Sequence, residues 1–252
     1  MMKGVVIVLV ALIVSWPTIA QGAPVVFEAS GESPADIQAA VDSFRAFLGP
    51  LNPNVPGSFP SGRREINWDG VPDAFSAPSN LPADFFNTNS PRGAVFFTPG
   101  TGFQVSADSD NPTNTPARFG NLHAEFPNLF STFSPQRLFT ALGSNITETL
   151  FFVPGSSTGA TVNGFGAVFT DVNRGNSTRI EYLDARGRLL LSRNVRAGSA
   201  ARGSLSFLGV GFDAGERAFA VRITSGGRVP RTPARDVVVM DDFIYGEPQE
   251  AQ

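Results

Sequence analysis

The chain has 252 residues, a formal net charge of −3, 23 phenylalanines and no cysteine. A chain of this size can bury one sizeable hydrophobic core, and the lack of cysteine excludes stabilisation by disulfides. The acidic balance excludes a generally basic nucleic-acid-binding protein. Because Lys3 is the only lysine, Schiff-base chemistry has no residue to use beyond the extreme N-terminus.

The N-terminal segment has the layout of a secretory signal peptide. A short basic start that ends at Lys3 precedes an apolar run over 4–16, and Pro17 ends that run ahead of several small residues. The run is too short to cross a bilayer as a helix. We therefore predict a signal peptide over 1–22 and an exported protein, secreted to the extracellular space or periplasmic, without stable membrane insertion. The alternative is an uncleaved N-terminal anchor.

The remaining chain, 23–248, is predicted to form one domain that begins with a single clear helix. Ser33 is suited to cap this helix, Pro34 to its first turn, and Gly49 to its end. Apolar residues recur between them at helical spacing. The rest of the segment 33–135 is dense in Pro, Gly, Asn and Ser, with short apolar stretches in between. This composition predicts short strands joined by long ordered loops.

The segment 136–247 is rich in predicted strands. Short β-type runs end at Gly, Pro, Asn or Asp, at the spacing expected of a sandwich or barrel. The stretch "LDARGRL" predicts a hairpin with its turn at 185–187. In 179–182 charged and apolar residues alternate, which predicts one wet and one buried face. The residues that we expect in the core are Phe165, Val168, Phe207, Leu208, Phe219, Val221, Val238 and Phe243.

Four stretches of this segment carry a resemblance to a known group of proteins. They are "VNGFGAVFTDVN", "STRIEYLDARGRLL", "LSFLGVGFDAGERAFAVRITSG" and "DVVVMDDFIYGEP". Together they resemble exported bacterial proteins, some of which end in a membrane-sorting tail of the PEP-CTERM type. The resemblance covers about 136–247 and implies a jelly-roll sandwich of the galactose-binding, carbohydrate-module kind, but no particular reaction. Since "GEPQEAQ" has no apolar sorting helix, we expect release rather than anchoring.

The expected fold is therefore mainly β: a jelly-roll-like β-sandwich with one N-terminal α-helix and long ordered loops. Two patterns that could indicate catalysis are weak. Ser157 in "GSSTG" matches the nucleophile pattern of hydrolases, but a strand-like sequence follows it, so a turn is predicted. The only histidine, His123, cannot form a zinc site without further nitrogen or sulfur ligands. A catalytic pairing of His123 with a distant carboxylate is the alternative to an ordinary loop histidine.

Carboxylates offer two further kinds of site. A glycoside hydrolase needs two of them across a cleft, and the candidates are Glu65, Asp69, Asp73 and Glu125. Acidic residues in such Gly- and Pro-rich segments also form turns, which is the alternative interpretation. Calcium binds six to eight oxygen ligands. "DSDN" at 108–111 supplies some, although Pro112 departs from the spacing of an EF-hand loop.

The resemblance implies a second calcium site. In many carbohydrate-module jelly rolls, an acidic residue near the first strand and one in the last strand share a structural calcium. Glu28 and Asp241 or Asp242 are similarly placed. Antiparallel pairing of 25–29 with 237–245 would bring these carboxylates together, so calcium is the expected cofactor.

Trp68 and its neighbours are the predicted ligand-binding residues. Sugar-binding sites combine an aromatic face with amides and charged groups, and Trp68 lies beside Arg64, Asn67 and Asp69 in the sequence. Alternatively, Trp68 fills the junction between a loop and the sandwich. We therefore expect a non-catalytic binding or surface- and matrix-associated module whose ligand is a glycan or other cell-surface polymer. The alternatives are a secreted polysaccharide hydrolase with paired carboxylates and a structural adhesion protein.

Overall fold

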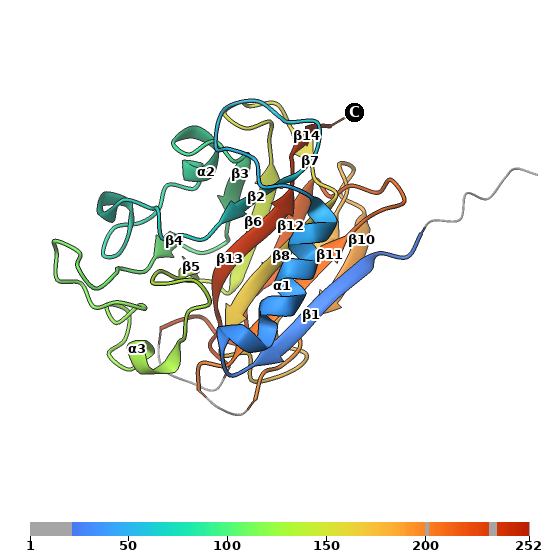
Figure 1. Ribbon diagram of the computed structural model, residues 1–252. Helices are drawn as coiled ribbons and strands as arrows, with labels where there is room; N and C mark the ends of the chain where they lie inside the picture. The colour runs from blue at the N-terminus through green and yellow to red at the C-terminus, as the bar shows by residue number, and fades with distance from the viewer. Residues whose placement is uncertain (1–21, 200–201, 232–235, 252) are drawn as a thin grey trace, which may run out of the picture.

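The computed structural model describes residues 22–199, 202–231 and 236–251, which form two antiparallel sheets packed face to face (Figure 1). The predicted signal peptide lies outside the described residues, apart from Gly22. The expected fold class is confirmed, because the described part is mainly β, with a sandwich-like arrangement, an N-terminal helix and long loops.

The larger sheet has the strand order β1-β11-β8-β13-β5-β4, and β2 also pairs with β13. Its strands are β1 (Val25–Gly31), β2 (Arg63–Ile66), β4 (Gly102–Val105), β5 (Phe139–Leu142), β8 (Gly164–Thr170), β11 (Leu205–Gly211) and β13 (Val239–Gly246). The predicted pairing of the first strand with the last is wrong. β1 pairs with β11, and both β11 and β8 lie between β1 and β13.

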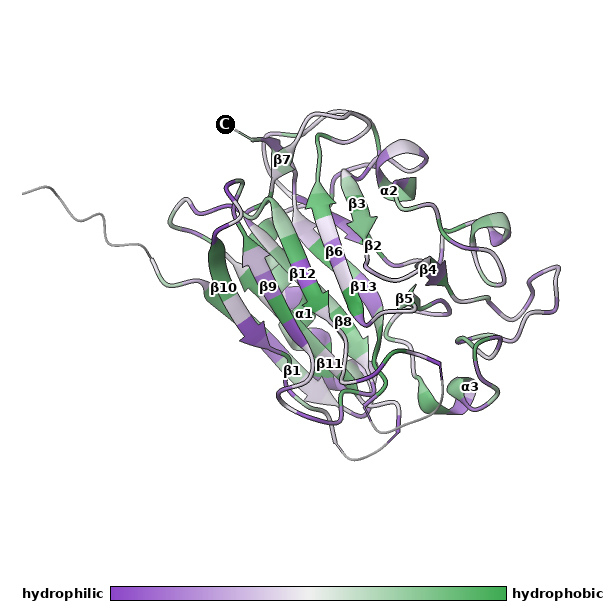
Figure 2. Cartoon of the chain, turned by 180° about the vertical axis from the view of Figure 1, so that it is seen from behind, coloured by the Kyte–Doolittle hydropathy of each residue, from purple (hydrophilic) through white to green (hydrophobic). Residues whose placement is uncertain are grey.

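The smaller sheet has the order β10-β9-β12-β6-β3. Its strands are β3 (Ala94–Phe97), β6 (Ile146–Phe151), β9 (Arg179–Leu183), β10 (Leu189–Asn194) and β12 (Ala220–Thr224), while β7 (Ala160–Thr161) and β14 (Gln249–Glu250) form a separate pair. The predicted hairpin is confirmed as β9 and β10. The alternation in β9 is confirmed too, because Ile180 and Tyr182 are buried while Arg179 is exposed. In Figure 2 the outer face of this sheet is turned to the viewer, and no helix of the described part covers it.

The predicted helix is confirmed as α1 (Pro34–Leu48). Asp36 accepts a hydrogen bond from the Ser33 backbone N–H at 2.9 Å, which anchors its first turn. The apolar side of α1 packs on the outer face of the larger sheet, where Phe44 lies 5.8 Å from Phe207 between ring centroids. The other helical segments are short: η1 (Asp73–Phe75), α2 (Phe85–Thr88) and α3 (Phe126–Leu129). Among the described residues, no helix has the length and apolar character needed to span a membrane.

The hydrophobic core lies mainly between the two sheets, and a second apolar cluster joins α1 to the larger sheet. The prediction of core residues is largely confirmed. Those that are fully buried are Phe165, Val168, Phe207, Leu208, Val221, Val238 and Phe243. Phe219, directly before β12, is only half-buried. Val168 and Phe207 belong to the cluster under α1 rather than to the core between the sheets.

Candidate functional site

Trp68, the predicted aromatic platform, is part of the core. Its side chain is 1% exposed and stacks on Phe139 with ring centroids 4.1 Å apart. Phe243 packs edge-on against it at 5.1 Å, and the indole Nε1 donates a hydrogen bond to the backbone oxygen of Asp241 at 2.8 Å. The indole therefore has no face open to solvent, and Trp68 fills the junction between loop and sandwich instead of presenting a face to a sugar.

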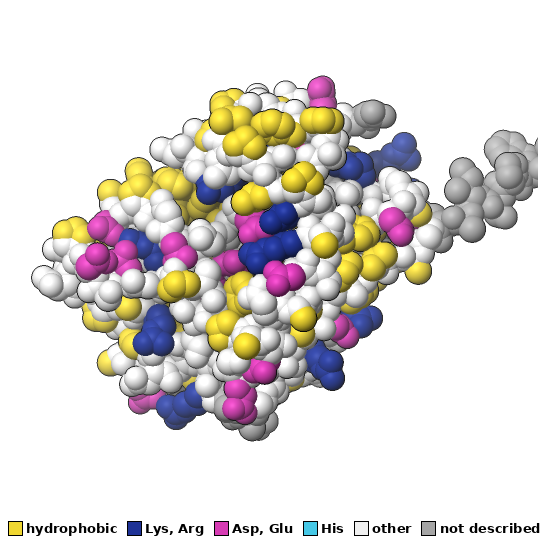
Figure 3. All heavy atoms as spheres, in the orientation of Figure 1, with side chains coloured by type: hydrophobic (Ala, Val, Ile, Leu, Met, Phe, Trp, Pro, Cys, Tyr) yellow, Lys and Arg dark blue, Asp and Glu magenta, His cyan; other side chains and the backbone are white. Residues whose placement is uncertain are grey.

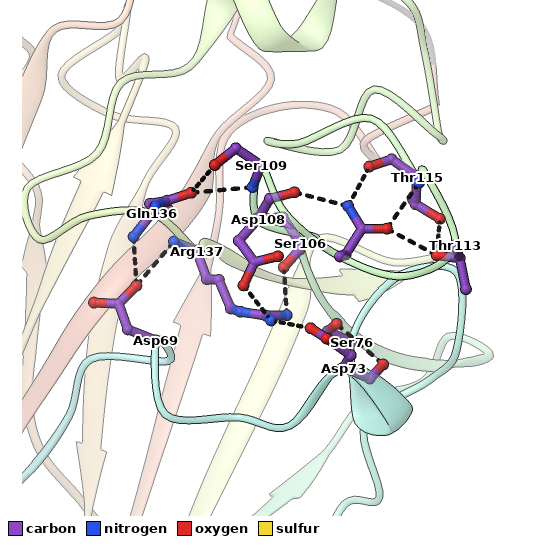
Figure 4. Close-up of polar contacts among 11 residues, drawn as sticks. Asp69, Asp73, Ser76, Ser106, Asp108, Ser109, Thr113, Thr115, Gln136 and Arg137 are labelled. Carbon is purple, nitrogen blue, oxygen red and sulfur yellow. Dashed lines mark hydrogen bonds and ion pairs between the residues drawn. The ribbon is translucent and has the colours of Figure 1, made fainter.

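Two other predicted ligand-binding residues also have structural partners. Arg64 is fully buried, and its guanidinium forms a double hydrogen bond with Glu247, at 2.6 and 2.7 Å. Asp69 accepts the backbone N–H groups of Gln136 (2.5 Å) and Arg137 (3.0 Å), as Figure 4 shows. Asp69 ties two loops together, and Arg64 joins β2 to the end of β13, so both residues serve the architecture of the fold.

The same network accounts for further sequence candidates. Arg137 Nη2 binds Asp73 at 2.5 Å and Asp108 at 2.6 Å (Figure 4), while Asn111 hydrogen-bonds within its own turn. The stretch "DSDN" therefore engages a guanidinium and backbone groups. The interpretation of these acidic residues as loop-forming is the one that the contacts favour.

Asn67 is the predicted ligand-binding residue that faces an open surface. It lines a cleft of about 470 Å³ between α1, the loop before β2, the end of β2, the loop 133–135 and β13, which we call the α1–β13 cleft. In the middle of the corresponding face, arginine and acidic side chains lie side by side (Figure 3). The charged residues of the cleft are Arg45, Glu65, Arg92 and Asp242. Its amide residues are Gln38, Asn52, Asn54 and Asn67.

A β-bulge in β13 places the carboxyl group of Asp242 on the lining of this cleft, next to the buried Asp241. Met240 pairs with Phe169 and Phe243 with Ala167, so two residues of β13 lie against one residue of β8. Met240 and Phe243 both pack in the core between the sheets, although an unbroken strand would direct them to opposite faces. The two residues between them, Asp241 and Asp242, are therefore both directed away from that core.

The strand that pairs with β13 also changes here. β5 pairs with it at Met240, while β2 pairs with it from Phe243 onwards. The interruption leaves Asp241 and Asp242 without a strand neighbour on that side, and the loop 131–135 takes that place. Phe133 N donates to Asp241 Oδ2 at 2.7 Å, and Ser134 Oγ lies 2.7 Å from Asp242 Oδ1.

Both carboxyl groups of this pair are hard to ionise. Burial, followed by the negative charge of Asp242, raises the pKa of Asp241 well above its usual range. Burial also raises the pKa of Asp242, against the opposing effects of the Ser134 hydroxyl and Arg45. Since two adjacent buried carboxylates repel each other, one proton shared by the pair is the favoured state.

Arg45 of α1 connects this pair to Glu65 of β2. Its Nη2 lies 2.8 Å from Glu65 Oε2 and 3.6 Å from Asp242 Oδ2. Arg63 also binds Glu65, with 2.6 Å between Nε and Oε1. The structure thus brings Glu65, a predicted hydrolase candidate, together with Asp242, a predicted calcium ligand, on one wall of the cleft.

The donors around these carboxylates do not fit a calcium ion. A guanidinium, a backbone N–H and a hydroxyl already point at Asp241 and Asp242, whereas a calcium site needs converging oxygens. Glu28 lies on the edge strand β1 and binds Arg193 at 3.1 Å, so the structure does not bring it to the aspartates. Within the described ranges, no group of three or more His, Cys, Asp or Glu side chains could hold a metal.

The remaining catalytic candidates do not converge on the cleft. Ser157 lies exposed in the loop between β6 and β7, consistent with the predicted turn. His123 accepts the backbone N–H of Glu125 through Nδ1 at 3.2 Å, while the Glu125 side chain is exposed.

Sequence reasoning missed Arg45, Arg92 and the loop 133–135 as parts of the site. No local signal in the sequence relates Arg45 of the predicted helix to residue 242. Comparison of the chain with protein-family models, with curated proteins and with solved structures finds no match. The assignment of a function therefore depends on the cleft itself.

Proposed function

We propose that this protein is an exported, non-catalytic module that binds glycan in the α1–β13 cleft. The observation that carries the proposal is the pair of amide side chains, Asn54 and Asn67, on the cleft wall. Both are exposed, and neither side chain has a hydrogen-bond partner within the described part of the chain. Each amide offers a donor and an acceptor, which match adjacent hydroxyls of a sugar ring.

The apolar part of the cleft supports the same ligand class. Leu51 is 55% exposed, and Phe133 and Pro135 also line the cleft. A pyranose has apolar C–H faces ringed by hydroxyls, so a site that alternates apolar side chains with amides is complementary to it. Export is supported by the signal-peptide layout of 1–22.

The absence of catalysis is proposed because the carboxylates of the cleft are already engaged. Arg45 and Arg63 together bind both oxygens of Glu65, which leaves it a poor base or nucleophile. Asp241 is fully buried, and Ser134 binds the carboxyl of Asp242. A hydrolase would need one free carboxylate and one accessible acid across the bound sugar.

Hydrolysis of a polysaccharide is the second candidate, and one observation favours it. Glu65 and Asp242 reach the same nitrogen of Arg45, so their carboxyl groups lie on one wall of the cleft. The raised pKa of Asp242, caused by burial, is a property of a general acid. Bound sugar would have to displace Arg45 from Glu65 for this chemistry to proceed.

Binding is tested by a glycan-array screen of the mature protein, followed by calorimetry with the glycans that bind. The double variant Asn54→Ala/Asn67→Ala is expected to weaken binding at least tenfold. Asn194→Ala, which removes an exposed amide from β10 outside the cleft, is the matched control and should bind like the wild type. If no glycan binds, or if both variants bind equally well, the proposal fails.

The second candidate is separated from the first by incubating the bound glycan with the protein and measuring new reducing ends. The binding module releases none. Release that Asp242→Asn abolishes, with binding retained, would establish the hydrolase instead.

A further inference from the structure

Arg92 is the arginine of the α1–β13 cleft whose charge is not balanced. It precedes β3, lines the cleft and is half-buried. Its Nε donates to the backbone oxygen of Glu65 at 2.9 Å, and its Nη1 binds the Ser90 hydroxyl. The guanidinium carbon lies 5.2 Å from the centroid of the Phe86 ring. No hydrogen bond or ion pair joins its Nη2 to any described residue.

The neighbouring arginines differ from Arg92 in this respect. Arg45 and Arg63 bind Glu65, and Arg64 binds Glu247, so each has a carboxylate partner. Among the described residues, Arg92 donates only to neutral acceptors, and its hydrogen bond to Glu65 goes to the backbone oxygen and not to the carboxylate. Burial lowers the pKa of Arg92, Tyr245 opposes this effect, and the positive charge of Arg64 adds to it.

A partly desolvated guanidinium without an anion is costly, and an anion that reaches it from the cleft would offset that cost. The fork of guanidinium N–H groups matches a planar carboxylate in particular. No described residue bonds Nη2, and Arg92 lines the cleft, so a ligand bound there is placed to supply the anion.

We infer that the glycan bound in the α1–β13 cleft is acidic, a polymer with uronic-acid units, and that Arg92 binds a carboxylate of one unit. This inference rests on the proposed function. Arg92 then determines charge selectivity, while Asn54 and Asn67 bind hydroxyls that acidic and neutral sugars share.

The test uses oligogalacturonate as the carboxylated probe and its fully methyl-esterified form as the neutral probe. Binding of each is measured by calorimetry, at low and at physiological salt, to the wild type and to Arg92→Gln and Arg92→Lys. Arg174→Gln removes an exposed positive charge from the β8–β9 loop outside the cleft and is the matched control. Thermal melting of each variant shows whether it is folded before binding is compared.

The wild type is expected to bind oligogalacturonate at least tenfold more tightly than its methyl ester, with the difference smaller at higher salt. Arg92→Gln should abolish this preference, and Arg92→Lys, which keeps the charge but not the fork, should retain part of it. Arg174→Gln should change nothing.

Equal binding of the two probes, or a preference that survives in folded Arg92→Gln, would overturn the inference and leave glycan binding intact. Binding of neutral glycans alone would do the same. If neither probe and no glycan of the array binds, the proposed function falls together with the inference.

Discussion

The two sheets of the sandwich differ in what lies on their outer faces. α1 packs on the larger sheet, and β8, β11 and β13 are buried along their whole length. The outer face of the smaller sheet is open, and β9 alternates between exposed and buried positions. Across this open face, Glu181, Arg222, Glu148 and Phe97 lie in register on four adjacent strands.

The difference decides what a charged side chain does in each sheet. Glu148 and Arg222 form an exposed ion pair at 2.6 Å on the open face, where water solvates both groups. Asp241 and Asp242 lie in a strand that is buried on both faces, so their charge has to be suppressed or compensated. A carboxylate pair in the covered sheet is therefore the exceptional feature, whereas the charges of the open sheet are an ordinary solvated surface.

The largest expected effect compares one phenylalanine from each sheet. Phe207→Ala removes a ring that is fully buried under α1 and should lower the free energy of unfolding by about 3 to 5 kcal/mol. Phe97 is 49% exposed on the open face, so Phe97→Ala should change the free energy of unfolding by about 0.5 kcal/mol or less. Urea unfolding of both variants measures the difference. If both variants lose the same free energy of unfolding, Phe97 is buried in solution and the outer face of the smaller sheet is not open.

The second prediction concerns Asp241 and the pH dependence of stability. Because burial raises its pKa in the folded state, its contribution to stability is present below pH 3.8 and is lost as the pH rises through the raised value. Asp241→Asn cannot ionise, and its amide oxygen can still accept the Phe133 N–H. We expect the variant to be more stable than the wild type at pH 8, with the gap closing towards pH 4.

Glu148→Gln on the open face is the control for this experiment. It removes a carboxylate from an exposed ion pair, which contributes roughly 0 to 1 kcal/mol. Urea midpoints between pH 4 and pH 8 give both profiles. If the stability of Asp241→Asn and of the wild type changes with pH in the same way, the raised pKa of Asp241 is contradicted.

The third prediction compares an aspartate that follows a strand in each sheet. Asp171 follows β8 in the covered sheet, and burial raises its pKa to about 6. Its stabilising contribution is present below pH 3.8 and lost as the pH rises through about 6. Asn tolerates the positive φ of 68° found at this position. Asp171→Asn should therefore raise the free energy of unfolding by about 1 to 2 kcal/mol above pH 6 and leave it unchanged below pH 4.

Asp184 follows β9 in the open sheet and should behave in the opposite way. The backbone N–H of Arg188 and other local donors lower its pKa, so its contribution is present above pH 3.8 and is lost as the pH falls. Asp184→Asn should therefore reduce stability at neutral pH. Urea unfolding at pH 7.5 measures both variants. If Asp171→Asn and Asp184→Asn change the free energy of unfolding in the same direction, the contrast between the sheets is refuted.

The smallest expected effect is that of calcium. The carboxyl groups of Asp241 and Asp242 already face a guanidinium and hydrogen-bond donors. The melting temperature should therefore be the same in millimolar calcium as in chelator. Calorimetry under both conditions measures this. A rise with calcium that Asp242→Asn removes would show that the carboxylates rearrange around the ion.

Sequence alone determined the features that depend on a few neighbouring residues. Ser33 and Gly49 bracket α1 because capping acts within one turn of a helix. The alternation over 179–182 predicted the faces of β9 correctly because water covers one side of its sheet. Burial of Phe165 and Phe243 followed from their place in apolar runs, and the turn at Ser157 followed from the strand-like sequence after it.

Only the tertiary structure decided the site. β1 pairs with β11 rather than β13, and this strand order depends on contacts across the whole chain. The bulge that directs Asp241 and Asp242 to one side depends on the register between β13 and β8, which an alternating pattern does not encode. Trp68 is buried because Phe139 and Phe243 come to it from distant strands. The cleft unites segments that are far apart in the sequence, so the positions of Arg92, Asn54 and Asn67 along its wall are apparent only once the chain has folded.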